Sequence, residues 1–208
     1  YLLTLYLQHI LGYSPIMPAL AFLPFCAGII VGAIVSSKLV TRFAPREVAA
    51  PAALIGGAAL FWLANIGQEL NYMWHFMPAA FLTAFGFVGA VIALALTAVE
   101  GVQTQETGIA SALFNASQQI GVALGLAVLS TIAVSATAGR LPGALAALYR
   151  GRETGDAGLV RSASDALIHG YGLALAGAGA ALVIAAVISA VLVNAKRGQV
   201  STGTIAVH

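Results

Sequence analysis

Residues 107–139 form an uncharged run, TGIASALFNASQQIGVALGLAVLSTIAVSATAG, in which apolar side chains predominate. A bilayer core is about 30 Å thick and a helix rises 1.5 Å per residue, so about 20 apolar residues span it. The run is longer than this, and it lacks the strict alternation of apolar and polar residues that is typical of a barrel strand. It therefore predicts a membrane-spanning α-helix over about 107–135.

The composition of the whole chain agrees with this interpretation. Of the 208 residues, 60% are apolar and only 8% are charged, and the mean hydropathy is +0.96. Soluble domains average about 25% charged residues, and intrinsic disorder requires low hydrophobicity. Cys26, the single cysteine, excludes an internal disulfide framework, and a net charge of +2 is too small for nucleic-acid binding. The composition indicates an integral membrane protein that contacts the lipid bilayer and binds no nucleic acid.

The charged residues divide the chain into spans. We predict an all-α integral membrane protein, a six-helix half-bundle over 1–195 with one partial and five complete transmembrane helices, followed by a tail over 196–208. A polar loop is expected over 140–165. The chain starts with Tyr1 and shows no signal-peptide pattern, so we expect the C-terminal part of a longer protein. The six helices are expected at about 1–12, 16–37, 48–68, 70–99, 107–135 and 166–194.

Basic residues predict the orientation. The short 38–47 loop carries Lys38, Arg42 and Arg46, whereas the arginines of the 140–165 loop are interleaved with acidic residues. Basic residues in short loops close to helix ends favour the cytoplasmic side. We therefore expect a multi-pass protein of the inner (plasma) membrane, with the 38–47 loop and the C-terminus in the cytoplasm.

Polar side chains recur on one side of the 107–135 helix. Ser111, Asn115 and Gln118 are spaced by four and three residues, and Gln119 lies beside them. An unpaired amide in hydrocarbon costs several kcal/mol, so these groups must meet a neighbouring helix or water. They form either the wall of a substrate cavity or a hydrogen-bonded clamp between helices, and both interpretations stay open. Gln8, near the outer end of the first helix, either faces the same cavity or lies at the interface.

Small residues at helical spacing predict close helix packing. Gly28 and Gly32 form one Gly-x-x-x-Gly pattern, and Gly121 and Gly125 form another. Small residues one turn apart let two helices approach closely in lipid. Because the chain contains 23 Gly, the composition alone can also produce this spacing.

Several kinds of chemistry have no sequence support. No Asp, Glu, Lys or Arg lies in the middle of a predicted span, where a proton relay would need one. The four histidines lack metal-ligand spacing, and no phosphate-binding loop or nucleophile–base set is present. We expect no enzymatic activity, no metal and no cofactor in this chain.

Three stretches resemble the C-terminal half of a major facilitator superfamily transporter and, more narrowly, the fourteen-helix drug–proton antiporters of bacteria. They are YLQHILGYSP at 6–15, GAIVSSKLVTRFAPREV at 32–48 and GIASALFNASQQIGVALGLAVLS at 108–130. The second is similar to the degenerate copy of the family's cytoplasmic gating loop, in which a glycine ends a helix and basic residues follow. Gly32, Lys38, Arg42 and Arg46 occupy those roles, whereas Ser37 replaces Asp and Ala44 replaces Gly.

The resemblance implies a function and a layout. The spans would be helices nine to fourteen, with the first and the 70–99 helix lining a central cavity, the 107–135 helix flanking it, and the 48–68 and 166–194 helices outside. Met77, Phe81 and Phe85 then become candidates for the cavity wall, with ordinary helix packing as the alternative.

The implied activity is proton-coupled efflux of drugs or other amphipathic small molecules by alternating access. The proton site would lie in the N-terminal half, and the complete protein would be a monomer. A major facilitator transporter of another substrate class, or a non-transporting membrane scaffold or remnant, is the alternative.

Overall fold

The computed structural model describes residues 20–65, 72–99 and 105–192. The predicted 1–12 helix, with Gln8, lies outside the described residues, as does the 196–208 tail. Within the described ranges the chain is helical and contains no strand. Five helices are long and apolar enough to cross a membrane. The all-α prediction and the five complete spans are therefore confirmed.

The first two helices are joined by a short basic connection. α3 covers Leu23–Val40 and α4 covers Pro45–Ala64. α3 ends after the predicted limit of 37, and α4 begins before the predicted limit of 48. Lys38 lies in the last turn of α3 and Glu47 in the first turn of α4. Both helices extend this far because charges of these signs complement the helix dipole. The Glu47 carboxylate also accepts a hydrogen bond from the Ala44 backbone N–H at 3.2 Å.

The remaining helices include a region that was expected to be a loop. A π-helical turn at Tyr72–Phe76 leads into α5, Met77–Val99. The prediction of a polar loop over 140–165 is wrong, because helices fill most of that region. α6 and α8 are 34 and 36 residues long, or about 50 Å each, and so reach beyond a bilayer core of about 30 Å. These helices are α6, Thr107–Arg140, α7, Ala144–Thr154, and α8, Ala157–Leu192.

Two glycines set the limits of α7, and an aspartate caps the start of α8. Gly143 and Gly155 have φ values of 70° and 72°, the left-handed conformation that a glycine adopts without strain. The Asp156 carboxylate then accepts hydrogen bonds from the backbone N–H groups of Gly158 and Leu159, each at 3.0 Å. Asp156 therefore caps the start of α8.

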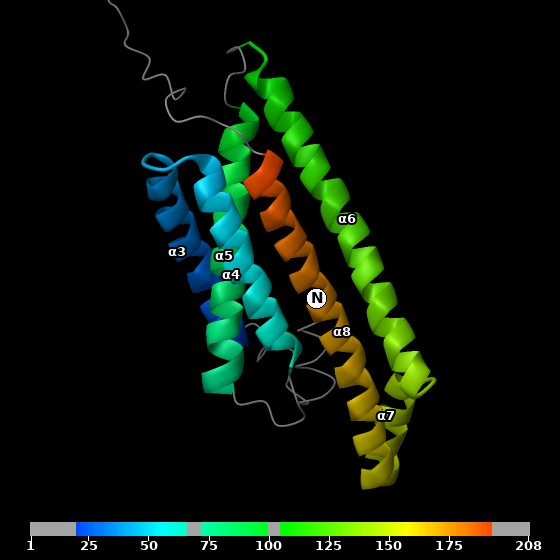
Figure 1. The fold of residues 1–208 in the computed structure, drawn as a ribbon. Helices are drawn as coiled ribbons and strands as arrows, with labels where there is room; N and C mark the ends of the chain where they lie inside the picture. Colours follow the sequence, from blue (N-terminus) through cyan, green and yellow to red (C-terminus); the bar gives the residue numbers. More distant parts are fainter. Residues whose placement is uncertain (1–19, 66–71, 100–104, 193–208) are drawn as a thin grey trace, which may run out of the picture.

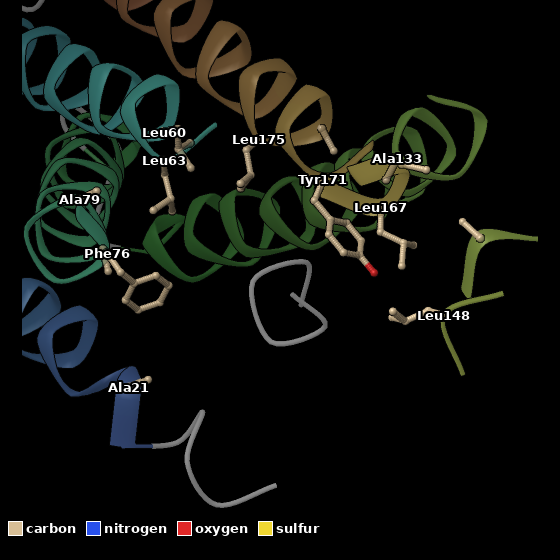
Figure 2. Close-up of a cluster of buried hydrophobic side chains, with 14 of the residues drawn as sticks. Ala21, Leu60, Leu63, Phe76, Ala79, Ala133, Leu148, Leu167, Tyr171 and Leu175 are labelled. Carbon is tan, nitrogen blue, oxygen red and sulfur yellow. The ribbon is translucent and has the colours of Figure 1, made fainter. Parts of the chain in front are cut away.

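The helices form a bundle with α4 near its centre. α4 packs between α5 and α8, α3 packs against α5, and α6 and α7 pack against α8 (Figure 1). The main apolar core joins the start of α5 to α4, α7 and α8 (Figure 2). Phe76, Leu63 and Leu148 are its largest fully buried side chains.

Glycines allow the central helices to approach closely. A Cβ at Gly57 of α4 would lie 3.1 Å from the Gly179 carbonyl oxygen of α8, and one at Gly86 of α5 would collide with the Ala52 carbonyl oxygen of α4. No side chain fits between the helices at these distances. The dispersion attraction between the two backbones stabilises the helix pair in lipid.

Candidate functional site

The aromatic residues predicted for the cavity lie where α5 crosses α3. Gly28 of α3 contacts the backbone of Phe81, and Gly32 contacts the backbone of Phe85. The two phenyl rings stack on each other along α5, with centroids 6.3 Å apart and planes inclined by 14°. Both rings, and Met77 one turn earlier, are half-buried. Phe81 and Phe85 thus form a flat apolar surface that remains partly open in this chain.

Thr83 is a polar group of the same helix that the sequence analysis did not select. Its hydroxyl oxygen is buried and has no hydrogen-bond partner within the residues that the structure describes. Thr97, further along α5, instead donates to the Ala93 carbonyl at 3.0 Å. The sequence alone could have identified this position, because Thr83 is the only polar side chain between Met77 and Leu96. A buried hydroxyl without a partner is costly, so Thr83 marks a position where a partner is needed.

The polar residues of α6 divide into two pairs. Ser111 and Gln118 are half-buried, whereas Asn115 and Gln119 are exposed. The Asn115 amide is satisfied within α6, since it donates to the Ser111 carbonyl oxygen at 3.0 Å. Other half-buried positions of α6 share the side of Ser111 and Gln118, among them Phe114, Gly125 and Leu129. Since α6 packs mainly against α8, this pair lies on the packed side and the exposed pair at its border.

The structure does not bring the two sets of predicted residues into one cavity. The stacked rings of Phe81 and Phe85 accompany α3, while α6 packs mainly against α8. A Cβ at Gly121 or Gly125 would meet nothing within 4 Å among the described residues. The packing predicted at these two glycines therefore stays a prediction, and so does the cavity wall predicted on α6. Both concern contacts with parts of the protein outside the described residues.

The predicted gating loop is partly corrected. Lys38, Arg42 and Arg46 are exposed around the α3–α4 connection, where the Thr41 hydroxyl donates to the Lys38 carbonyl at 2.7 Å. Gly32 does not end the helix, because α3 continues to Val40. Gly32 is instead a mid-helix position that makes room for the backbone of Phe85.

Comparison with known proteins places this bundle in a family. Residues 1–126 match the model of the Major Facilitator Superfamily. The chain belongs to this superfamily. It is 35% identical to the puromycin resistance protein pur8 of Streptomyces alboniger over 199 residues, which are 93% of this chain and 37% of that protein.

Two further relatives carry names of the same kind. The cephamycin export protein CmcT of Amycolatopsis lactamdurans is 35% identical over 72% of this chain and 31% of its own length. The probable actinorhodin transporter of Streptomyces coelicolor is 32% identical over 63% of this chain and 23% of its own length. The chain thus spans about a third of the length of such relatives. It is a multi-pass membrane protein of a transporter superfamily, with relatives named for drug and antibiotic export.

Proposed function

We propose that this chain forms the C-terminal half of a proton-coupled exporter of drugs or other amphipathic small molecules. The exporter would work by alternating access in the plasma membrane, as a monomer, with the C-terminus in the cytoplasm. The names of the relatives support export of antibiotic-like molecules. The observation that carries the proposal is the half-buried Gln118 in the uncharged α6, because an amide in hydrocarbon requires a partner.

The α5 surface suits a solute of this kind. Amphipathic molecules are held mainly by buried apolar area, with a few polar groups fixing their orientation. Stacked Phe81 and Phe85 offer a flat apolar surface, whereas Thr83 lies on the opposite side of α5, the side that packs against α4. We assign the two rings to substrate contact.

We assign the proton-coupling residue to the N-terminal half of the transporter. The spans of this chain hold no carboxylate in their central parts, so the coupling acid would belong to the N-terminal half. The basic side chains Lys38, Arg42 and Arg46 support a cytoplasmic position for the α3–α4 connection. The two halves would rock about a site at the membrane midplane.

A resistance assay with the full-length protein tests the proposal. We expect a drug-sensitive bacterial host that expresses it to survive higher concentrations of puromycin. Gln118→Ala should reduce this resistance without loss of protein in the membrane, while Ser117→Ala, an exposed polar position of the same helix, should leave it unchanged. Resistance that is equal in the two variants would remove α6 from the substrate pathway, and no resistance to any amphipathic compound would favour another substrate class or a scaffold.

A further inference from the structure

A contact between a tryptophan and a histidine joins the end of α4 to the start of α5. Trp62 lies in the last turn of α4, and His75 lies in the π-helical turn that precedes α5. Their ring centroids are 6.4 Å apart and the ring planes are inclined by 70°, an edge-to-face arrangement. Neither residue belongs to the substrate surface proposed above. Under the proposed topology, this contact lies at the outer end of the bundle.

The residues next to this pair in sequence are held in the apolar core. Leu63 and Phe76 are only 1% and 0% exposed and belong to the same buried cluster (Figure 2). The Phe76 ring also packs edge-to-face on Phe22, with centroids 5.9 Å apart. By contrast, Trp62 is 44% exposed and His75 is exposed. The contact therefore lies at the border of a fixed core, where protons from solution reach the imidazole.

The strength of this contact depends on the charge of the imidazole. Histidine is the side chain that ordinarily changes its charge between about pH 5 and pH 8. A neutral imidazole packs on the indole as one aromatic ring on another, whereas a protonated imidazole adds the attraction between a cation and the π electrons. Because the contact favours the protonated ring, the stabilisation it adds is present at acidic pH and is lost as the pH rises.

Few charged groups other than His75 itself lie on the described helices that meet here. The stretches without Asp, Glu, Lys or Arg are 20–37, 48–65 and 72–99. Arg140, Asp165 and His169 line a cavity against Phe61, the neighbour of Trp62 in α4, and they include charges of both signs. The dipole at the end of α4 favours a positive charge, and the dipole at the start of the π-helical turn opposes one. These influences offset one another, so the Trp62 ring is the partner that distinguishes the two protonation states.

We propose that His75 and Trp62 form a pH-sensitive switch between the end of α4 and the start of α5. When the outer solution is acidic, protonated His75 holds the start of α5 against α4, and at alkaline pH this contact weakens. Since α5 carries Phe81 and Phe85, the external pH then determines how firmly the outer end of this helix is held. The position of the switch on the outer side rests on the proposed function and topology, whereas the contact itself does not.

Tryptophan fluorescence of the purified full-length protein in detergent tests this proposal. A protonated imidazole quenches an adjacent indole, because it accepts an electron from the excited ring. The signal of Trp62 is the difference between the wild type and Trp62→Phe, measured from about pH 8 to about pH 5. We expect this signal to fall as the pH is lowered, and to stay constant when the same difference is measured in a His75→Gln background. The matched control His169→Gln, a histidine that lines the neighbouring cavity, should behave as the wild type does.

Thermal unfolding then separates a switch from a contact that pH does not affect. The midpoint of the wild type should exceed that of His75→Gln by more at about pH 5.5 than at about pH 8. His75→Arg, which is positively charged at both pH values, should keep its advantage over His75→Gln at the higher pH. A Trp62 signal without pH dependence, the same pH dependence in the His75→Gln background, or an equal midpoint difference at the two pH values would each overturn the proposal. Because no transport is measured, failure here leaves the proposed export function unaffected.

Discussion

Gly32 on α3 lies so close to Phe85 on α5 that a Cβ at position 32 would be 2.7 Å from the Phe85 carbonyl oxygen. Gly28 has the same relationship to Phe81, one turn earlier on both helices. The atoms in contact belong to the backbone, which cannot rotate away as a flexible side chain can. This pair of glycines therefore fixes the distance between α3 and the aromatic part of α5.

Gly32→Val should destabilise the protein by separating α3 from α5. Overpacking of this kind typically costs about 1–3 kcal/mol. Thermal unfolding of the purified protein in detergent measures the effect as a lower midpoint. Gly139→Ala is the matched control, because a Cβ at that helical position would meet nothing within 4 Å. A midpoint reduced equally in both variants would show that loss of glycine, rather than the α3–α5 contact, is responsible.

The crossing of α6 and α8 allows a test of coupling between two residues. A Cβ at Gly170 of α8 would collide with the Thr137 hydroxyl and the Ala133 carbonyl oxygen of α6. Gly170→Ala should destabilise the protein, and adding Thr137→Ala should restore part of the loss, because the side-chain atom in contact is removed. A double-mutant cycle of unfolding free energies measures this interaction. Strictly additive effects would mean that the two residues do not meet.

The cap at the start of α8 predicts a local effect. Asp156 accepts two backbone hydrogen bonds there, from Gly158 and Leu159. Asp156→Ala should remove about 0.5–2 kcal/mol of stabilisation and increase hydrogen exchange at these two amides. Asp156→Asn retains an acceptor oxygen and should behave almost as the wild type. Unchanged exchange in the alanine variant would show that α8 does not depend on this cap.

The proposed topology can be tested by cysteine labelling. Ala157 is exposed at the start of α8, and Thr41 is exposed in the α3–α4 connection. Since Cys26 is a free, exposed cysteine, the variants are made in a Cys26→Ser background. Ala157→Cys should react with an impermeant thiol reagent in intact cells, and Thr41→Cys only after permeabilisation. The reverse pattern would place the C-terminus outside the cell.

Much of the fold could be predicted from the distribution of charge. The five spans follow from uncharged runs. Hydrocarbon excludes charged side chains from the middle of a spanning helix, whichever helices pack against it. The same criterion failed at 140–165, because hydropathy detects the part of a helix in lipid and not its continuation into water. Arg150 and Arg161 suggested a loop, whereas Gly143, Gly155 and Asp156 carried the helix-end signals.

The candidate site was less predictable because it depends on which helices meet. Gly28 and Gly121 have the same spacing to a second glycine in sequence, yet only Gly28 has a neighbour in the described chain. Likewise, helical periodicity placed Asn115 and Gln118 on one face, and packing left the first exposed and the second half-buried. Periodicity determines a face, but the partner of that face comes from tertiary structure.

Drug uptake into proteoliposomes tests the central proposal most directly. The full-length protein is reconstituted, and uptake of labelled puromycin is followed after a pH gradient is imposed. A proton-coupled exporter predicts uptake by the molecules oriented inside-out, abolished by a protonophore and reduced by Gln118→Ala but not by Ser117→Ala. Uptake that proceeds at the same rate with and without the gradient would contradict proton coupling. No uptake of puromycin or of other amphipathic compounds would contradict the assignment as a drug exporter.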